Sequence, residues 1–491
     1  MNYLLGIDLG STNIKAILYD ENGIGTAQSS VGTPVFVNEA GLSVLDPEKI
    51  WSIICGLIKD VVLQLEDKNG KNASKDIAGI ACTSIAESGV LLDKKGEPAF
   101  PIIMWYDPCT MGMERYWNDE FDKKRLVDIT GQRAQHNYSL NKIRWIKEHY
   151  PEAYEKTQIF MCMADYISYK LTGRAVMNYS LACRTMMFDI HEKKWSEKIC
   201  DTAGISLGIL PPLVPSGISL GKVLPDAAKA CGLTEQTEVF SGGHDHICGA
   251  LAAGILDSES LLDSSGTAEQ FLSVPDDFSA FKPLALEGFN MGLHTADGLY
   301  YAAGAMTSSG RTADWFAKEI GAGYDTSSSE AGAKGISFLP HLAGGSSPAR
   351  DMHDYGAFTG LRAHHTKADM MQAVYEGLCF ELKLGIERLF SSKPSRIVVT
   401  GGGTRNEKWM QTKANILGKE LTVPKEYQST AMGAALLAGI GAGIYKDAHD
   451  AYKKTFSIEK IYSPIDSFDY TVSFERYRKV NAALNEIYSQ Y

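Results

Sequence analysis

The sequence LLGIDLGSTNIKAILYD, residues 4–20, decides the predicted fold. Two apolar runs flank Gly10, Ser11 and Thr12, and this pattern predicts two buried strands joined by a tight β-hairpin. Glycine permits the turn without a Cβ clash, so we expect the amides of these three residues to point at one anion. Asp8 ends the first strand, where a carboxylate beside phosphate oxygens makes sense if a divalent cation lies between them. An ordinary hairpin with an Asp-containing turn is the alternative.

Length and composition limit the class of protein. The chain has 491 residues, which exceeds the usual size of a single hydrophobic core, so at least two domains are expected. No apolar run reaches the roughly 18 to 20 residues that a membrane helix needs, and the N-terminus lacks a signal-peptide pattern, so we expect a cytoplasmic protein. A net charge of −11 opposes non-specific binding to nucleic acid or to anionic lipid. The expected ligand is therefore a small molecule.

Two polar segments are candidates for a substrate site. Glu87 follows the strand predicted at residues 77–83, at a strand end where α/β folds usually place ligands. A solvated loop acid is the alternative for this residue. The loop PIIMWYDPCT places Trp105 near Asp107, a combination that suits stacking on a sugar ring and accepting a hydroxyl, but also suits a plain turn.

The motif GGHDH contains the candidate catalytic residue, Asp245. A strand predicted at residues 238–241 runs into this motif, and a helix of small residues follows at 248–255. The two glycines let a ligand approach the backbone, and small residues let two halves of a protein pack tightly and still move. A helix N-cap is the alternative role for Asp245. His244 and His246 suggest a metal site, but no third ligand has a suitable spacing.

The opening pattern returns in altered form in LLDSSGTAEQFLSV, residues 261–274. Strand, small-residue turn and strand follow one another again, and aligning Gly266 and Thr267 with the first turn places Ser264 opposite Asp8. The second hairpin thus keeps the phosphate-binding backbone and lacks the acid. Two such hairpins can clamp a polyphosphate, and the duplication indicates two related domains.

Two glycine-containing segments near the end of the chain suit nucleotide binding. The strand predicted at residues 396–400 runs into GGGTRN and then into a helix at 407–417, and a glycine turn before a helix N-terminus is a general nucleotide-binding device. The spacing matches neither a Rossmann fingerprint nor a Walker loop. A second small-residue helix, predicted at residues 428–439, contains Gly433, which permits close approach of a ligand or of another helix.

Taken together, these segments resemble the FGGY family of carbohydrate kinases, which have the actin- and hexokinase-like ATPase fold. GIDLGSTNIKAILYD is similar to the family's first phosphate motif and GGHDHICGALAAG to its catalytic-aspartate motif. LLDSSGTAEQF is similar to the second phosphate motif, and VVTGGGTRNEKWMQTKANILG with STAMGAALLAG to the adenosine motif. The stretches SLNKIRWIKEH and GAFTGLRAHHTKADMMQAVYE, residues 139–149 and 356–376, resemble the two signatures by which the family is recognised.

The resemblance implies an α/β protein with two ribonuclease H-like domains and an interdomain active-site cleft. The implied division is 1–247 and 248–445, followed by a helical tail at 446–491. The implied activity is ATP-dependent phosphorylation of a small sugar (a pentulose or hexulose) or polyol, with Mg²⁺; a homodimer is left open. The implied site residues are Asp245 as general base, Asp8 orienting Mg²⁺ through water, Glu87, Trp105, Asp107 and Asp245 at the sugar, and Gly10, Ser11, Thr12, Lys15, Gly266, Thr267, Gly310, Gly402, Gly403 and Asn406 at the nucleotide.

The chain departs from the family where the sugar should bind. Members close to xylulokinases carry Gln-Met-His-Gly where this chain has Ile-Ala-Glu-Ser at residues 85–88, and an arginine where it has Cys109. These departures argue against D-xylulose as the substrate and favour a neutral polyol or ketose over an acidic aldonate. A gluconate-type kinase is the alternative within the family. An actin- or chaperone-like ATPase coupled to a protein partner is the alternative outside it, although such a protein has no reason to contain residues 356–376.

Overall fold

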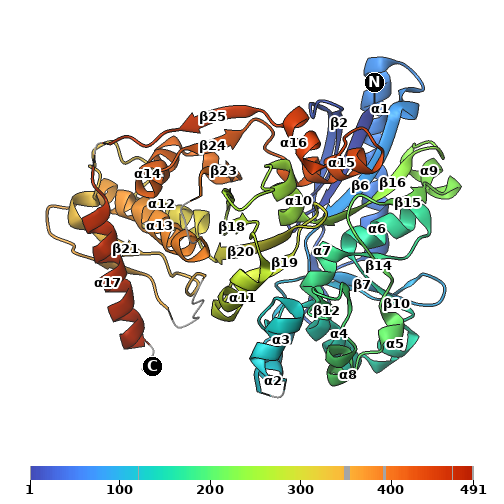
Figure 1. Ribbon diagram of the computed structural model, residues 1–491, viewed down its shortest axis with the longest axis horizontal. Coiled ribbons are helices and arrows are strands. Elements are labelled where there is room, and N and C mark those ends of the chain that lie inside the picture. Colours follow the sequence, from blue (N-terminus) through green and yellow to red (C-terminus); the bar gives the residue numbers. More distant parts are fainter. Residues whose placement is uncertain (1, 120, 348–353, 391–393, 467, 489–491) are drawn as a thin grey trace. The chain divides into compact units, whose positions relative to one another are not determined.

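The computed structural model describes residues 2–119, 121–347, 354–390, 394–466 and 468–488. They form two compact units, each assembled from separated segments of the chain (Figure 1). Unit 1 comprises residues 1–256, 292–300 and 428–456, and unit 2 comprises residues 257–291, 301–427 and 457–491. These bounds differ from the contiguous domains expected from the sequence. After residue 256 the chain enters unit 2, and it returns to unit 1 at residues 292–300 and again at residues 428–456.

Unit 1 is built on a six-stranded sheet. Its strands, in spatial order, are β15 (Ser219–Lys222), β16 (Glu238–His244), β6 (Ile77–Ser84), β1 (Tyr3–Leu9), β2 (Asn13–Asp20) and β3 (Gly25–Gly32). β1 is antiparallel to β2 and pairs Asp8 with Lys15, which confirms the predicted opening hairpin. β1 is parallel to β6, and β6 is parallel to β16, so the carboxyl ends of these three strands share one edge of the sheet.

Helices from distant parts of the sequence cover this sheet. α15 (Ser429–Gly441) packs on β1, β6 and β16, and it approaches so closely that a Cβ at Gly6 would lie 2.0 Å from the Ala431 carbonyl oxygen. α10 (Asp245–Ala252) packs on α15, where a Cβ at Gly433 would lie 1.9 Å from the Cys248 carbonyl oxygen. Gly433 therefore permits close packing of two helices, one of the two roles expected for it.

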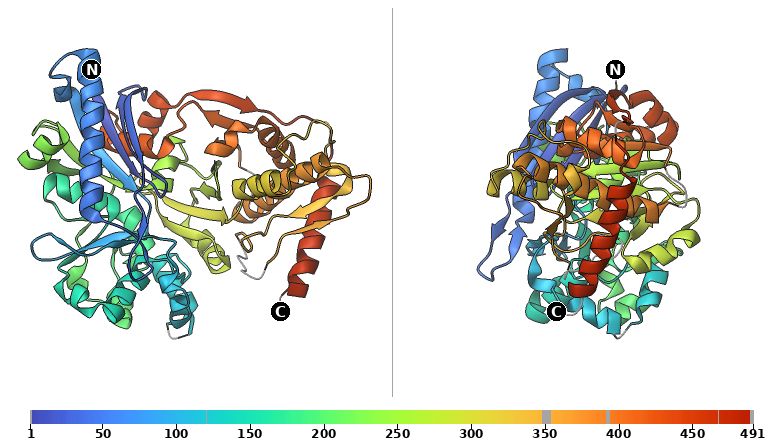
Figure 2. Two further views of the ribbon diagram at one scale, coloured as in Figure 1. Left: turned by 180° about the vertical axis from the view of Figure 1, so that it is seen from behind. Right: turned by 90° about the vertical axis from the view of Figure 1, so that its left-hand side faces the viewer.

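The remaining elements of unit 1 surround this core. α1 (Pro47–Asn69), the blue helix near the N-terminus in Figure 2, packs on β2 and β3, and α6 (Met163–Thr172) packs on β6 and β16. Asp46 caps α1 by accepting the amides of Glu48 and Lys49. The other elements are α2 (Met113–Asp119), α3 (Lys123–Thr130), α4 (Ser139–His149), α5 (Pro151–Lys156), α7 (Tyr179–Ala182), α8 (Glu197–Ala203), α9 (Pro225–Cys231), α16 (Ala448–Thr455), β4 (Phe36–Val37), β5 (Ser43–Leu45), β7 (Gly89–Leu92), β8 (Pro98–Phe100), β9 (Ile102–Ile103), β10 (Ile159–Cys162), β11 (Met177–Asn178), β12 (Phe188–Asp189), β13 (Lys194–Trp195) and β14 (Leu213–Val214).

A second sheet, which lies in unit 2 apart from residues 292, 293 and 300 at the ends of two of its strands, repeats the sheet of unit 1. Its strands, in spatial order, are β19 (Asn290–Leu293), β20 (Tyr300–Met306), β18 (Glu269–Ser273), β17 (Ser260–Ser265), β23 (Arg396–Thr400), β24 (Leu421–Pro424) and β25 (Ile458–Tyr462). From β20 to β25 the directions match those of unit 1 from β3 to β15, with a central run of three parallel strands and an antiparallel hairpin beside it. The duplication predicted from two hairpins therefore extends to the whole sheet.

Helices α13 (Lys367–Leu389), α14 (Glu407–Leu417) and α12 (Gly310–Glu319) pack together in unit 2, α13 lying between the other two. A Cβ at Gly385 of α13 would lie 2.3 Å from the ring of Phe271, so α13 also packs closely on β18. α17 (Thr471–Tyr488), the red helix that precedes the C-terminus, lies against α13 and β21 (Ser337–Leu339), as Figure 2 shows. Unit 2 also contains α11 (Phe278–Glu287) and β22 (Ala357–Thr359).

Residues 446–491, predicted as a helical tail, include the edge strand β25 and divide between the two units. Four of the five residues of β25 are exposed, so the strand lacks the apolar alternation by which strands are recognised in a sequence. Within the described residues, no helix combines the length and the apolar character needed to cross a membrane.

Candidate functional site

Asp8 is a buried carboxylate at the end of β1. The hydroxyl of Thr430, at the start of α15, donates to Asp8 Oδ2 at 2.7 Å. Asp8 Oδ1 is buried and has no hydrogen-bond partner among the described residues. Burial, together with the nearby charge of Asp245, raises the pKa of Asp8 to about 6. A cation would stabilise a carboxylate in this position, because it would satisfy the open oxygen and offset the neighbouring acid.

Asp245 is the first residue of α10. Its Oδ1 accepts the backbone N–H of His246 at 2.6 Å and lies 3.1 Å from His244 Nε2. The N-cap position belongs to His244, so the alternative that Asp245 is only an N-cap is wrong. The reason is that β16 extends to His244, three residues beyond the predicted strand end, and the helix starts at once. Burial and the charge of Glu87 raise the pKa of Asp245 to about 7.

The histidines on either side of Asp245 are neutral. Burial lowers the pKa of His244 well below its usual value and lowers the pKa of His246 to about 4. Neutral His244 can donate through Nε2 to Asp245, which helps to orient the carboxylate. No cluster of three or more histidine, cysteine, aspartate or glutamate side chains that could hold a metal ion occurs among the described residues. His244 Nε2 lies 3.1 Å and His246 Nε2 lies 4.0 Å from Asp245 Oδ1, so both rings lie beside the carboxylate.

Glu87 is buried and ion-paired, so the alternative of a solvated loop acid is wrong. Its Oε1 accepts Arg184 Nε at 2.7 Å and Nη2 at 2.5 Å. The backbone of Glu87 has φ +64°, which is costly for a residue with a side chain. The Ser139 hydroxyl, at the start of α4, donates to the Glu87 carbonyl at 3.0 Å and helps to hold this conformation. A strained and buried acid at the end of β6 fits a ligand-binding position.

Arg184 is a residue that the sequence argument missed. It belongs to the short 3₁₀-helix Cys183–Thr185, and 97 positions separate it from Glu87. Its Nη1 donates to Gln132 Oε1 at 3.2 Å, and its guanidinium lies 4.9 Å from the centre of the Tyr138 ring. The one local sequence feature that could have drawn attention to Arg184 is its charge, because the rest of the segment 179–188 is uncharged up to Phe188.

The loop candidates Trp105 and Asp107 have different environments. Trp105 is partly exposed, and its Nε1 donates to Ser11 Oγ at 2.9 Å, so it lies at the tip of the first hairpin. Asp107 is 1% exposed; its Oδ2 accepts the Ser43 amide at 2.6 Å and its Oδ1 accepts the Cys109 amide at 2.9 Å. Each carboxylate oxygen of Asp107 accepts one backbone amide, as in the plain turn that the sequence also allowed, and a role at the sugar stays a prediction.

In the first hairpin, the amide of Gly10 is not directed as expected from the sequence. The Gly10 amide donates to the Asn13 carbonyl at 3.1 Å, so it closes the turn and does not point at an anion. The intermediate and exposed residues Ser11 and Thr12 carry the hydroxyls at the tip. Lys15 Nζ donates to Gln428 Oε1 at 2.7 Å, which ties the hairpin to the segment that precedes α15.

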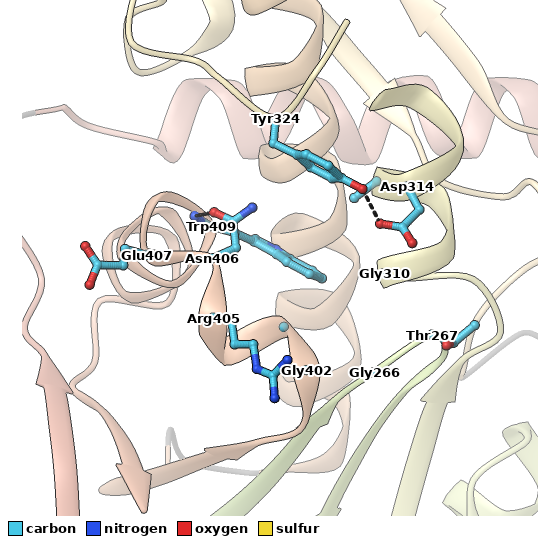
Figure 3. A pocket seen from close by; sticks show the side chains of 12 residues that line it. Gly266, Thr267, Gly310, Asp314, Tyr324, Gly402, Arg405, Asn406, Glu407 and Trp409 are labelled. Carbon is cyan, nitrogen blue, oxygen red and sulfur yellow. Dashed lines mark hydrogen bonds between the residues drawn. The ribbon is translucent and has the colours of Figure 1, made fainter. Parts of the chain in front are cut away.

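All six nucleotide candidates of unit 2 line one pocket of ≈700 Å³ (Figure 3). Six further residues complete the lining, among them polar and aromatic side chains that the sequence argument did not select. In Figure 3, the Tyr324 hydroxyl donates to Asp314 Oδ1, at 2.6 Å. The lining residues are Gly266, Thr267, Gly310, Ala313, Asp314, Tyr324, Gly402, Gly403, Arg405, Asn406, Glu407 and Trp409.

Backbone contacts shape this pocket. The Gly310 amide, at the start of α12, donates to the Gly266 carbonyl at 3.0 Å, and a Cβ at Gly310 would lie 2.4 Å from the same oxygen. Only glycine therefore lets α12 begin directly on the second hairpin. Asn406 caps α14 by accepting the Trp409 amide at 3.0 Å, and its Nδ2 donates to the Tyr375 hydroxyl at 2.7 Å. The pocket is thus walled by a phosphate-type hairpin and two helix N-termini.

A duplicated sheet with a phosphate-type hairpin in each copy is the actin- and hexokinase-like ATPase fold. The comparison with known families identifies the class further. The N-terminal domain of the FGGY family of carbohydrate kinases matches residues 3–252, and its C-terminal domain matches residues 265–442. The chain belongs to this family and is an ATP-dependent sugar kinase.

Individual relatives agree with this assignment. The xylulose kinase of Bacillus subtilis (strain 168) is 32% identical over 459 residues, which cover 92% of this chain and 90% of that protein. The gluconokinase of the same organism is 26% identical over 486 residues, covering 95% and 92%. The crystal structure of xylulose kinase from Rhodospirillum rubrum is similar with a TM-score of 0.89 at 24% identity, covering 99% of this chain and 100% of that one.

Proposed function

We propose that this kinase transfers the γ-phosphoryl group of ATP to a hydroxyl of a small neutral ketose or polyol, with Asp245 as the general base. The observation that carries the proposal is the buried Asp245 carboxylate, whose pKa is raised to about 7. Such a group is ionised over much of the neutral range, and it is still basic enough to accept a proton from a hydroxyl. In phosphoryl transfer the proton leaves late, so a well-positioned weak base is sufficient.

The pocket of unit 2 is the proposed ATP site. Gly266, Thr267 and Gly310 would contact phosphates, and Gly402, Gly403 and Asn406 would line the adenosine side. Transfer depends mostly on positioning and on neutralising charge. The amides of Gly266 and Gly310 already donate to the carbonyls of Ala268 and Gly266, so the Thr267 hydroxyl is the candidate phosphate donor of this hairpin. The hydroxyls of Ser11 and Thr12, and the Lys15 ammonium, are the corresponding candidates of the first hairpin.

Asp8 is the proposed residue for orienting Mg²⁺. The fit rests on its buried Oδ1, which has no hydrogen-bond partner in the described part of the chain. Described side chains offer no set of three ligands, which fits a cation held mainly by water and by phosphate oxygens. When bound, the ion would neutralise phosphate charge. Asp8 is held for this role by the hydroxyl of Thr430.

The charges of unit 1 support a neutral acceptor. The guanidinium of Arg184 is paired with Glu87, and the carboxylates of Asp8, Glu87 and Asp245 lie close enough for the charge of Asp245 to act on Asp8 and that of Glu87 to act on Asp245. A sugar acid would meet net negative charge, whereas the hydroxyls of a ketose or polyol can donate to these carboxylates. The relationship to a xylulose kinase makes a pentulose the first compound to try, and the relationship to a gluconokinase makes gluconate the necessary comparison.

The test is a coupled ADP-release screen with ATP and Mg²⁺ over pentuloses, hexuloses, polyols and aldonates. We expect rapid turnover with one neutral ketose or polyol and little with aldonates. A preference for gluconate would overturn the neutral-acceptor part of the proposal. ATP turnover that is equally fast without sugar, and is stimulated by a protein, would instead support the partner-coupled ATPase.

The pH dependence of kcat/KM should report the ionisation of Asp245. Its pKa is raised to about 7, so the protonated, inactive form predominates below that pH and activity should fall as pH decreases through about 7. Glu87→Gln removes a charge that raises this pKa, so the acid limb should move to lower pH. Initial rates at subsaturating sugar from pH 5.5 to 9 check both points; an unshifted limb in Glu87→Gln would contradict the assignment.

Glu87 and Asp107 should respond differently to substitution. Glu87→Ala should lower kcat/KM for the sugar at least about tenfold with little change in the KM for ATP, because an acceptor for sugar hydroxyls is lost. Asp107→Ala should mainly lower the melting temperature, because the amides of Ser43 and Cys109 lose their acceptors. Kinetics and thermal unfolding of both variants check this; a stable Asp107→Ala protein with weak sugar binding would restore Asp107 to the sugar site.

A further inference from the structure

A fully buried cluster of charged groups lies next to the second hairpin and has no part in the mechanism above. Lys413 of α14 is 1% exposed; its Nζ lies 2.5 Å from Asp263 Oδ2 on β17 and 2.8 Å from Glu269 Oε1 on β18. Both carboxylates are as buried as the lysine. Taking charged groups out of water is costly, and a buried ion pair often stabilises a fold no more than apolar side chains would, so stability alone does not explain this cluster.

The cluster joins the elements that wall the ATP pocket. Asp263 and Glu269 flank the hairpin turn that contains Gly266 and Thr267. The hydroxyl of Ser309, the residue before α12, donates to Glu269 Oε2. On the other side, Lys413 lies one helical turn after Trp409, which lines the pocket, and its Nζ is 5.2 Å from the centre of that ring.

The glycine turn after β23 rests on the same hairpin. Lys413 Nζ donates to Ser265 Oγ at 3.4 Å. A Cβ at Gly403 would lie 2.5 Å from that oxygen, and a Cβ at Gly401 would lie 2.5 Å from the Ser265 carbonyl oxygen. The side chain of Lys413 therefore contacts the hairpin residue against which the adenosine-side glycines pack.

We propose that Lys413 is a positioning residue of the nucleotide pocket: it neutralises Asp263 and Glu269 at the buried side of the hairpin and holds the hairpin, α12 and α14 in the arrangement that binds phosphates. The inference rests on the proposed ATP site. It goes beyond that site, because Lys413 does not line the pocket and would not touch the nucleotide.

The charge balance explains why the lysine matters. Burial and the charge of Glu269 raise the pKa of Asp263 well above its usual value; Lys413 lowers the pKa of Glu269 against the effect of burial. The two acids share one lysine, so the cluster is neutral when one of the two carboxyl groups holds a proton. Without the lysine, Glu269 would be an unpaired buried anion next to the turn that receives phosphates, and it would oppose both the local geometry and the ligand.

The test measures ADP binding to the full chain by calorimetry, with thermal unfolding and ATP kinetics beside it. Lys413→Met should weaken ADP binding and raise the KM for ATP by about tenfold or more, with the KM for sugar unchanged. Lys413→Met/Glu269→Gln restores neutrality, and glutamine can still accept from Ser309, so ADP affinity should return to within about threefold of wild type. Lys408→Met, an exposed lysine on the same helix, is the matched control and should bind as wild type.

The outcomes separate this inference from the proposed function. Wild-type protein that fails to bind ADP would overturn the ATP site, and the inference with it. Wild-type binding with unchanged affinity in a folded Lys413→Met protein would overturn the inference alone, as would a double variant that binds as weakly as the single one. If Lys413→Met does not fold, the neutral double variant decides: a folded double variant with wild-type ADP affinity supports the charge argument, and one without it overturns the argument.

Discussion

Asp245→Asn should abolish sugar phosphorylation while ADP binding stays within a few-fold of wild type. General-base contributions are typically of order 10² to 10⁴ in rate, and an amide cannot accept the proton. Asparagine keeps an oxygen for the His246 amide, so the start of α10 should be preserved. The pocket proposed for ATP is lined entirely by residues of unit 2, whereas Asp245 belongs to unit 1. Chemistry and nucleotide affinity should therefore respond separately.

Asp165→Asn is the matched control for this variant. Asp165 is also a buried aspartate in the first turn of a unit 1 helix; burial raises its pKa to about 8, and it accepts the Asn178 amide at 3.1 Å. Its replacement should leave kcat near wild type, which would show that losing a buried carboxylate is not enough to stop transfer. Coupled assays, ADP calorimetry and thermal unfolding of both proteins decide. An Asp245→Asn enzyme that retains most of its kcat would refute the general-base role.

The parts of the fold that were predictable are those encoded by local pattern. The two hairpins were visible as apolar runs around a glycine turn, because a buried strand needs continuous apolar side chains and the turn needs freedom at one residue. The small-residue helix with Gly433 was visible for a related reason, since close helix packing excludes side chains. The glycine turn before α14 was found in the same way, and it does line the pocket.

Side-chain partners across the fold could not be predicted. Arg184 pairs with Glu87 across 97 positions, and Lys413 pairs with Asp263 across 150 positions. Nothing in the local sequence says which buried acid will receive a particular cation, because that choice depends on how distant elements pack. Asp107 is a second case: the sequence did not show that its two carboxylate oxygens accept the amides of Ser43 and Cys109.

The division into units was also beyond local pattern. The segment that resembles an adenosine motif includes α15, which packs on β1 of unit 1. Its composition of small apolar residues predicted a closely packed helix without specifying the partner sheet. The predicted division placed a boundary at residue 445 because it kept each domain contiguous in the sequence. The compact units of the structure are instead defined by which segments pack together.

Gly266→Val should raise the KM for ATP by about a hundredfold, because a β-branched side chain at this pocket-lining position would occupy the space proposed for the phosphates and restrict the turn. The structure indicates that the protein would still fold. An ideal Cβ at Gly266 meets only the Ala268 carbonyl oxygen, at 3.2 Å, and the residue faces the pocket. At Gly310, by contrast, a Cβ would lie 2.4 Å from the Gly266 carbonyl oxygen, so substitution there would disrupt packing as well.

Ala268→Val separates loss of the phosphate site from general damage to the hairpin. It places the same β-branched side chain two residues further along the turn, at an exposed position that does not line the pocket. Its KM for ATP should therefore remain within about twofold of wild type, since surface substitutions away from a site have small effects. Steady-state kinetics with ATP varied at saturating sugar, supported by melting temperatures, compare the two proteins. A folded Gly266→Val enzyme with unchanged ATP kinetics would make the second hairpin purely structural, because a valine cannot share that space with a phosphate group.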